Sequence, residues 1–355
     1  MAMRAVWRPR MAASPVSILV LRNNDLGDVV VITPLFQALR QAFPDSRIVA
    51  AVGSWSKDIL GNNPYISEIV ECNAPWHNHV TATKSVLGPL KYIFGSPEAS
   101  RLRDRNFDVG IDVLGSTYGS MLLMRMGIPI RLGRKGYAGG HTGTTGYLIA
   151  SRTVSVAAEA TQFARLLKAD AETDFGSRPQ LFLDPAEIEE AEQAWLRVRG
   201  QSAHRGPRIV IAPGAGVPEK QWPVSMFAGL AGRLSSETCG LVLGSNADLA
   251  LGERIAQASH GWVNRCGDVS IRQSMALISL ADLVVCHSSF VMHLAAAFNK
   301  PCIIILTRAL DPVSHKALWE VEGVHHQMIP KEGEQHVQVS DVEHLARLLI
   351  QSARK

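Results

Sequence analysis

The sequence predicts an α/β protein made of two βαβ domains that face each other across a cleft. Short apolar runs alternate with amphipathic stretches along the 355 residues, which is the pattern of parallel sheets covered by helices. The length suffices for two domains of ordinary size. A hydrophobic content of 46% with 19% charged residues indicates a globular chain rather than a disordered one.

The first half of the chain contains one series of elements. A helix is expected from Asp28 to Phe43, because apolar residues recur there at helical spacing, and Pro44 ends it. The expected strands are short apolar runs: Val16–Leu21, Arg47–Val52, Glu68–Cys72 and Val109–Val113.

A second series begins near Arg208. Its expected strands are Arg208–Ala212, Cys239–Leu243, Leu283–Cys286 and Cys302–Leu306. Its expected helices are Met226–Leu234, Leu249–Ala258, Ile271–Leu280 and Phe290–Phe298.

The segment between the two series, residues 184–206, opens with a helix-capping Asp184-Pro185 and ends in a polar stretch. We therefore expect an N-terminal domain over residues 1–195 and a second domain over residues 196–340. The amphipathic end of the chain, residues 341–355, is expected to form a helix that packs back on the first domain.

Charge and cysteine usage exclude several classes of protein. A net charge of +4 is too small to imply nucleic-acid binding. The five cysteines are scattered and form no C-x-x-C pair, and H-E-x-x-H is absent, so no metal site is expected. Most of them lie in apolar runs, as in a cytoplasmic protein with reduced thiols. No apolar run is long enough to span a membrane.

The first candidate site follows the first strand, in the segment Arg22 to Asp28. It lacks the pattern G-x-G-x-x-G, which is the main sequence evidence for an enzyme that binds a nicotinamide dinucleotide. Asp28 falls at the carboxyl end of a strand and the start of a helix, which is where α/β sheets bind ligands. The alternative is an acidic helix cap favoured by the helix dipole.

The second candidate site is the loop from Pro213 to Pro223, again after a strand. Glycines such as Gly216 allow backbone N–H groups to approach an anion, and Lys220 supplies a positive charge. The P-loop pattern is not met, and the alternative is an ordinary loop with a solvated lysine.

Two further strand ends carry polar residues. Ser288 and Ser289 stand where a strand gives way to a helix, and His293 lies one turn further on, so the three could bind phosphate. Their alternatives are a serine cap and a buried core histidine. Asp248 follows another strand, where an acid can accept ribose hydroxyls or merely cap the next helix.

Taken in order, these elements resemble the family 9 glycosyltransferases, which include the lipopolysaccharide heptosyltransferases. Three motifs carry the resemblance: L-G-D-x-x-x-x-x-P-x-x-x-A-L-R from Leu26, P-G-A-G…K-x-W-P from Pro213, and A-D-L-V-V…M-H-L-A-A-A…K-P from Ala281. The resemblance implies a GT-B fold, with two Rossmann-like domains facing across a cleft. It places the acceptor on the first domain and the nucleotide sugar on the second.

The resemblance also assigns roles by position. Asp28 matches the catalytic carboxylate and Lys220 the diphosphate-binding lysine. The remaining matches are to the donor: Asp248 for the ribose, the backbone of Val269 for the nucleobase, and Ser289 and His293 for phosphate.

One motif departs from the family pattern. The family usually reads Asp-Ser/Thr-Gly-x-x-His in the third motif, whereas this chain reads Ser288-Ser289-Phe290-Val291-Met292-His293. Ser288 replaces an acid that contacts the donor sugar, and Phe290 replaces a glycine that lets backbone approach the diphosphate.

The resemblance implies an inverting, cytoplasmic enzyme that needs no cofactor and no metal, in agreement with the absence of any D-x-D triplet. Its expected partners are ADP-heptose and a lipopolysaccharide inner-core acceptor, a glycolipid that would bring it to the inner membrane. Three alternatives stay open: transfer from a different nucleotide sugar, a nucleotide-sugar-binding protein with impaired catalysis, and a GT-B epimerase.

Overall fold

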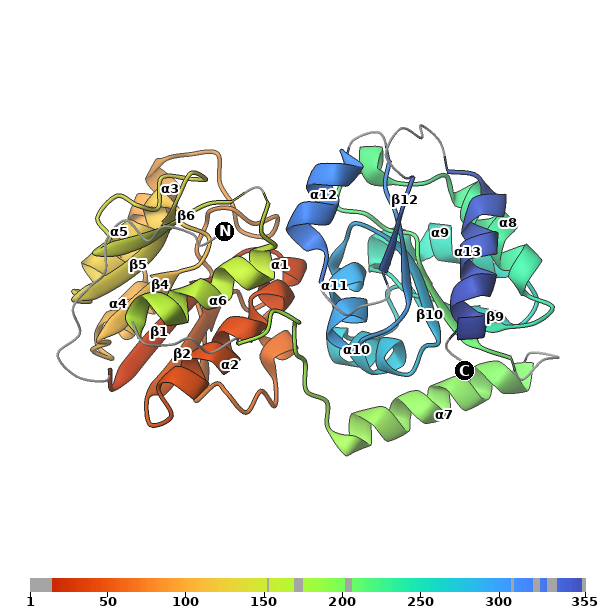
Figure 1. Ribbon diagram of the computed structural model, residues 1–355, viewed down its shortest axis with the longest axis horizontal. Helices are drawn as coiled ribbons and strands as arrows, with labels where there is room; N and C mark the ends of the chain where they lie inside the picture. The colour runs from red at the N-terminus through yellow and green to blue at the C-terminus, as the bar shows by residue number, and fades with distance from the viewer. Residues whose placement is uncertain are drawn as a thin grey trace. The chain divides into compact units, whose positions relative to one another are not determined.

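The computed structural model describes residues 15–151, 153–168, 175–201, 206–307, 310–321, 326–330 and 337–352. The chain divides into two compact units, residues 1–180 and 181–355. Each unit is a parallel six-stranded sheet with helices on both faces (Figure 1). The predicted α/β class is therefore confirmed.

The sheet of the first unit has the strand order β3-β2-β1-β4-β5-β6. Its strands are β1 (Ser17–Arg22), β2 (Arg47–Val52), β3 (Glu68–Glu71), β4 (Val109–Asp112), β5 (Ile130–Lys135) and β6 (Gly146–Ile149). Its helices are α1 (Leu26–Val31), α2 (Thr33–Ala42), η1 (Lys57–Leu60), α3 (Leu87–Gly95), α4 (Pro97–Arg103), α5 (Thr117–Arg125) and α6 (Val156–Leu167).

Strand β1 lies at the centre of this sheet and is buried along its whole length. It pairs in parallel with β2 on one side and β4 on the other. Its odd-numbered side chains Leu19 and Leu21 pack into a core with residues of α3 and α5. Helices α2 and α6 pack against each other.

The single helix expected from Asp28 to Phe43 is two helices. Helix α1 ends at Val31 and α2 begins at Thr33, with Pro34 in its first turn. Proline has no N–H to donate to the carbonyl four residues earlier, so the helical ladder is interrupted there.

The sheet of the second unit has the order β12-β11-β10-β7-β8-β9. Its strands are β7 (Arg208–Ala212), β8 (Cys239–Val242), β9 (Trp262–Asn264), β10 (Leu283–His287), β11 (Cys302–Ile305) and β12 (His326–Ile329). Its helices are α7 (Pro185–Gln201), η2 (Pro218–Lys220), α8 (Val224–Leu234), η3 (Asn246–Asp248), α9 (Leu249–Gln257), α10 (Ile271–Ser279), α11 (Phe290–Ala297), α12 (Pro312–Trp319) and α13 (Val339–Ser352).

Two expectations are wrong, one about the domain boundary and one about the packing of the last helix. The expected boundary after residue 195 falls inside α7, whereas the units divide after residue 180. Helix α7 belongs to the second unit because it packs on α10, and the buried Trp195 donates from Nε1 to the Leu277 carbonyl at 3.2 Å. Helix α13 packs on α8 through Val342, Ala346 and Ile350, which belong to the core of the second unit, and not on the first domain as expected.

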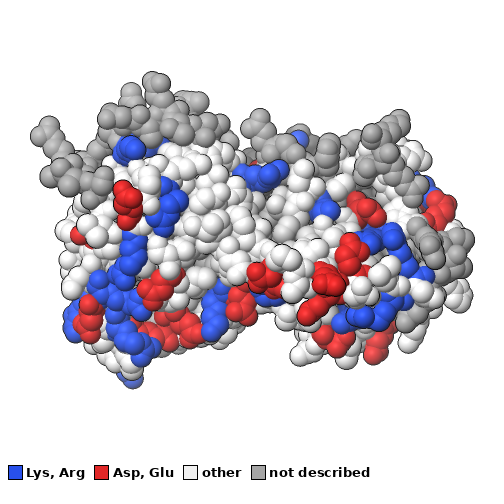
Figure 2. Space-filling view, turned by 90° about the horizontal axis from the view of Figure 1, so that it is seen from below, with Lys and Arg blue, Asp and Glu red and all other residues white. Residues whose placement is uncertain are grey.

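The surface and the helices add two observations. On the face drawn in Figure 2, Lys and Arg are interspersed with Asp and Glu. The ion pairs of the protein include those of Arg105 with Glu68 and of Arg208 with Glu192. Within the described part of the chain, none of the helices has the length and apolar character needed to cross a membrane.

Candidate functional site

Three of the candidate residues, Asp28, Lys220 and Ser288, lie at one kind of position in the two sheets. In each sheet the strand order reverses between two neighbouring strands, β1 and β4 in the first unit and β7 and β10 in the second. Loops that leave the carboxyl ends of such neighbours run in opposite directions and leave a crevice, where open α/β sheets bind ligands. Asp28 follows β1, and Lys220 and Ser288 follow β7 and β10.

Asp28 lies in the first turn of α1, and two donors hold its carboxylate. Arg22 at the end of β1 approaches Oδ1 with Nη2 at 2.7 Å, and the backbone N–H of Asp25 donates to Oδ2 at 3.3 Å. The Asp28 side chain keeps 29% of its surface exposed, whereas that of Arg22 keeps 4%. The helix-cap alternative is thus partly correct, but the carboxylate is also fixed in place and accessible.

A second carboxylate, Asp112, lies beside this site and was missed from the sequence. It ends β4, pairs in register with Leu21 next to Arg22, and accepts from the Ser116 backbone N–H at 2.7 Å. Burial raises the pKa of Asp112 to about 6, although its Ser116 and Gly115 hydrogen bonds and the Arg22 charge oppose that rise. The sequence does contain a signal for it, because Asp112 is an acidic residue near the end of an apolar run that was expected to form a strand.

The loop after β3 is fastened to the loop after β1. Asn23 donates to the Trp76 carbonyl at 3.0 Å and Asn24 donates to the His77 carbonyl at 2.6 Å. His79 contacts the Asp25 carboxylate through its backbone N–H and through Nδ1, at 2.9 and 2.5 Å. Asn24 Oδ1 and Trp76 Nε1 are buried and have no hydrogen-bond partner among the described residues. Asn24 lies four residues before Asp28, and Trp76 belongs to the loop that Asn23 contacts, so both unpaired atoms belong to the two segments joined beside Asp28.

In the second unit, His287 fastens both ends of the Pro213–Pro223 loop. Its Nε2 accepts from the Trp222 backbone N–H at 2.7 Å, and its Nδ1 lies 3.3 Å from the Gly214 carbonyl. The ring is fully buried, and burial lowers the pKa of His287 to about 4. A neutral ring with its proton on Nδ1 satisfies both contacts. No role was assigned to His287 from the sequence, because its contacts join segments far apart in the chain.

Asp248 lies against this loop. Its carboxylate occupies the space where a side chain on Gly214 would begin, so the glycine permits close contact between the loops after β7 and β8. One of its oxygens also accepts from Ser245, from the backbone N–H at 2.8 Å and the hydroxyl at 2.7 Å. Asp248 therefore belongs to the capping box of η3 with Ser245, whereas α9, the helix that the alternative expected it to cap, receives no hydrogen bond from its side chain. By contrast, a side chain on Gly216 would meet nothing, so the fold itself does not require that glycine.

The third motif begins α11. Ser289 is the N-cap residue of this helix, but its side chain does not cap it, and Phe290 is the first helical residue. Ser288, Ser289 and Phe290 are all partly exposed. His293 is 8% exposed and meets the Trp319 ring edge-on, with ring centroids 5.1 Å apart. Lys220 and His293 both act electrostatically on His315, so the structure brings these two predicted residues into one neighbourhood.

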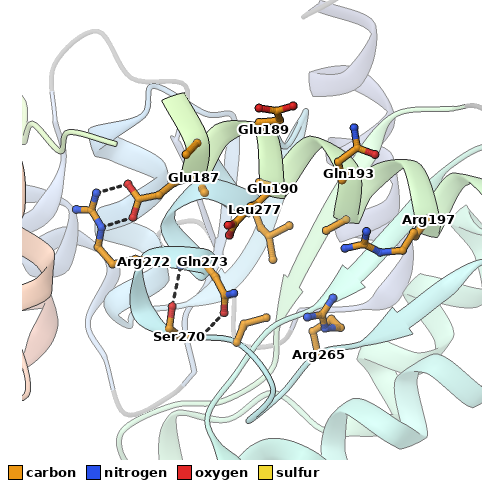
Figure 3. A pocket seen from close by; sticks show the side chains of 15 residues that line it. Glu187, Glu189, Glu190, Gln193, Arg197, Arg265, Ser270, Arg272, Gln273 and Leu277 are labelled. Atoms are coloured by element: carbon orange, nitrogen blue, oxygen red, sulfur yellow. Dashed lines mark hydrogen bonds and ion pairs between the residues drawn. The ribbon is translucent and has the colours of Figure 1, made fainter. Parts of the chain in front are cut away.

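Val269 precedes α10 and lies apart from the phosphate-binding candidates. It borders a cavity of about 780 Å³ between α7 and α10, which is also lined by Glu190, Arg197 and Arg265 (Figure 3). An ion pair between Glu187 and Arg272 lies at one end of it. None of Gly216, Lys220 or His293 lines this cavity. The Val269 segment is nevertheless joined to the Asp248 loop, because the Gly267 N–H donates to the Gly244 carbonyl at 3.0 Å.

Among the described residues, no three His, Cys, Asp or Glu side chains are grouped so that they could hold a metal ion. All five cysteines are buried and free, and burial raises the pKa of Cys72 and Cys266 to about 12.

Comparison with known proteins now adds to this geometry. Residues 99–328, more than half of the chain, match the model of glycosyltransferase family 9 (heptosyltransferase). Lipopolysaccharide heptosyltransferase 2 of Escherichia coli is 25% identical over 316 residues, which cover 84% of this chain and 86% of that protein. Lipooligosaccharide heptosyltransferase 2 of Haemophilus influenzae is 26% identical over 350 residues, covering 92% and 95%.

A solved structure agrees with the fold. The structure of E. coli ADP-heptose lps heptosyltransferase II superposes with a TM-score of 0.75 at 19% identity, covering 96% of this chain and all of that one. The two parallel six-stranded sheets are thus those of a GT-B protein, as the resemblance implied. The chain belongs to glycosyltransferase family 9 and is a glycosyltransferase.

Proposed function

We propose that the protein is an inverting, metal-independent transferase that moves heptose from ADP-heptose to an inner-core lipopolysaccharide acceptor. The names of its relatives support this donor and this pathway. The observation that carries the proposal is the chemistry at the two switch points. One sheet presents a fixed, partly exposed carboxylate, and the other presents a cationic loop, hydroxyls and a helix N-terminus.

Asp28 is the proposed general base. An acceptor hydroxyl has a very high pKa, so a positioned carboxylate must take its proton while the new bond forms. The hydroxyl oxygen attacks the anomeric carbon of the sugar as the bond from that carbon to the phosphate oxygen breaks. The proton goes to Asp28, and the electron pair of the broken bond leaves with ADP. A single displacement of this kind inverts the anomeric carbon.

The leaving group gains negative charge as the bond breaks, and the second unit offers groups that stabilise it. Lys220 supplies a cation, the Ser288 and Ser289 hydroxyls can donate hydrogen bonds, and the N-terminus of α11 presents free backbone N–H groups. In this proposal His293 also contacts phosphate, Asp248 the ribose, and the Val269 backbone the nucleobase. These groups take the place of a metal ion.

The acceptor is proposed to be a glycolipid met at the cytoplasmic face of the inner membrane. Apolar side chains around α3 support this, because four of them are more than half exposed: Val80 (61%), Val86 (66%), Leu87 (59%) and Phe94 (59%). Large exposed apolar side chains gathered in one segment are typical of interaction sites. Sedimentation with vesicles that contain the acceptor lipid tests the contact, and Phe94→Asp should weaken it if the segment touches lipid.

The proposed activity is tested by the release of ADP from ADP-heptose with and without the acceptor, each with and without EDTA. We expect release that requires acceptor and persists in EDTA. Release without acceptor at the same rate would indicate hydrolysis, and loss restored by Mg²⁺ would contradict the metal-free mechanism. Binding of ADP-heptose without any turnover would favour a protein with impaired catalysis.

A second candidate is transfer from a different nucleotide sugar. It rests on Ser288 and Phe290, which replace the family's acid and glycine at the start of α11. A phenyl ring at the first helical residue occupies space that a glycine leaves open to the diphosphate. A thermal-shift panel of nucleoside diphosphates and their sugars distinguishes the donors, because a ligand at 100 times its Kd stabilises by about 2.7 kcal/mol.

A further inference from the structure

Helix α12 brings a second histidine, His315, to the neighbourhood of Lys220 and His293. His315 lies in the second turn of this helix and is 6% exposed. Its ring centroid is 6.4 Å from that of Trp319, whose other neighbour is His293 at 5.1 Å. The rings of His293, Trp319 and His315 therefore form one cluster, contributed by α11 and α12.

The Nε2 atom of His315 is buried and has no hydrogen-bond partner among the described residues. An unsatisfied buried nitrogen destabilises the folded protein, and such atoms call for an explanation. His287 in the same unit shows the usual outcome, since both of its ring nitrogens have partners. Both ring nitrogens of His326 on β12 are also buried without a partner among the described residues, and His315 differs from His326 in that the Lys220 charge acts on it as well as that of His293.

The charges around His315 identify the missing partner. Burial, together with the nearby positive charges of His293 and Lys220, lowers the pKa of His315 to about 4. His326 on β12, which packs against α12, also interacts electrostatically with His293. On α12 itself, Lys316 pairs with Glu320 at 3.5 Å, with side chains more than half exposed. The two groups whose charge lowers the His315 pKa, His293 and Lys220, are both basic, and an anion placed beside them would favour protonation of the ring.

We propose that His315 is a further ligand of the nucleoside diphosphate, neutral in the empty protein and protonated when the diphosphate binds. The inference rests on the proposed function, because it takes the ligand of Lys220 and His293 to be a diphosphate. A diphosphate beside these two side chains offers an oxygen acceptor to Nε2. Its negative charge also raises the pKa of the His315 ring, opposite to the effect of Lys220 and His293. Binding then adds one proton to the protein, and affinity increases as the pH falls.

The test is calorimetry of ADP binding to the wild type, to His315→Gln and to His344→Gln. His344 is an exposed histidine on α13, so it serves as the matched control. Each titration is run in PIPES and in imidazole, whose ionisation enthalpies differ, so that the protons taken up can be counted. ADP itself titrates near neutrality, and for that reason the difference between variants is the readout.

We expect His315→Gln to bind ADP about tenfold more weakly at pH 6, as for loss of a charge-assisted hydrogen bond. It should also take up fewer protons than the wild type, and the difference in affinity should shrink at pH 8. Adenosine, which lacks the diphosphate, should bind both proteins equally. His344→Gln should match the wild type, and thermal unfolding establishes that each variant is folded. If His315→Gln does not fold, the comparison is made with His315→Asn. The pH dependence of the wild-type Kd for ADP then provides a second test that needs no variant.

Equal affinity and equal proton uptake in the wild type and His315→Gln would overturn the inference while leaving the proposed function intact. If the wild type binds neither ADP nor UDP or GDP, the proposed function fails and the inference fails with it. If it binds UDP or GDP instead of ADP, the same comparison is made with that nucleotide, because all three carry the diphosphate.

Discussion

The Arg22 guanidinium lies 2.7 Å from the Asp28 carboxylate, and the two residues come from the end of β1 and the first turn of α1. The arginine is almost entirely buried, so its position is fixed by the sheet. It also acts electrostatically on Asp112 at the end of β4. Arg22 thus holds the carboxylate of the proposed base, Asp28, and its charge partly offsets the cost of burying the Asp112 carboxylate. The same side chain therefore affects both the proposed chemistry and the stability of the first unit.

Replacing Asp28 with Asn should reduce transfer about 10²–10⁴-fold, because the amide has the size of the carboxylate but cannot accept the proton. The affinity for ADP should stay unchanged, since the proposed nucleotide site lies in the other unit. Steady-state rates and calorimetry check the two statements. Asp104→Asn, at a side chain that is 66% exposed, serves as the control. A variant that keeps more than half of the wild-type turnover would show that Asp28 is not the base.

Asp112→Asn should stabilise the protein at neutral pH and leave its stability unchanged near pH 3. The folded-state pKa of about 6 lies above the ordinary 3.8, so ionisation costs more in the folded protein than in the unfolded chain. The wild type therefore loses stability as the pH rises from about 4 to about 6, and the variant avoids this loss of a few kcal/mol. Urea unfolding of both proteins at several pH values measures it. A difference that does not change with pH would contradict the assigned shift.

Lys220→Ala should weaken ADP binding and also lower turnover, because its charge acts on the diphosphate in both the ground state and the transition state. The control is Lys57→Ala in the first unit, whose ammonium is paired with Glu71 at 2.8 Å. Calorimetry with ADP and steady-state rates with ADP-heptose give both effects. Unchanged ADP affinity would place Lys220 on the solvated surface, as the structural alternative held.

The double change Ser288→Asp with Phe290→Gly should raise the preference for ADP-heptose, if these residues adapt the site to another donor. A carboxylate makes hydrogen bonds about twice as strong as those of a hydroxyl, and the glycine reopens space at the start of α11. Each single change should do less, since neighbouring residues in one site are usually not additive.

Competition between nucleotide sugars measures that preference. Glycine in a helix costs about 1 kcal/mol, so the fold of the variant is checked first by thermal unfolding. A wild type that already uses ADP-heptose efficiently, together with a poorer double variant, would show that the two residues only repack this end of the helix.

The elements predicted from the sequence are those with clear apolar runs. Strands β2 and β7 have the predicted limits, and β1, β4 and β10 were placed within a residue, because buried central strands are continuously apolar. Strands β5, β6, β9 and β12 were not predicted, since they are short or carry Gly, Arg and Lys and lie toward the edges of their sheets. The fold class and the family, which depend on the central elements, are confirmed.

The candidate site was predictable only in part, for a related reason. Residues within a strand-loop-helix segment, such as Asp28 and Lys220, are visible as local patterns. The contact of His287 with Gly214 and the electrostatic interaction of Asp112 with Arg22 join segments far apart in the chain, so no local pattern reports them. The same holds for His315, which shares the Trp319 ring with His293 only in the folded unit.

The anomeric configuration of the product tests the central claim most directly. The enzyme is incubated with ADP-heptose and the inner-core acceptor, and the glycosidic bond of the purified product is assigned by NMR. A single displacement assisted by Asp28 predicts a heptose whose anomeric configuration is opposite to that of the donor. A product that retains the configuration of the donor would contradict the account, because it would require two displacements and a nucleophile that the mechanism does not contain.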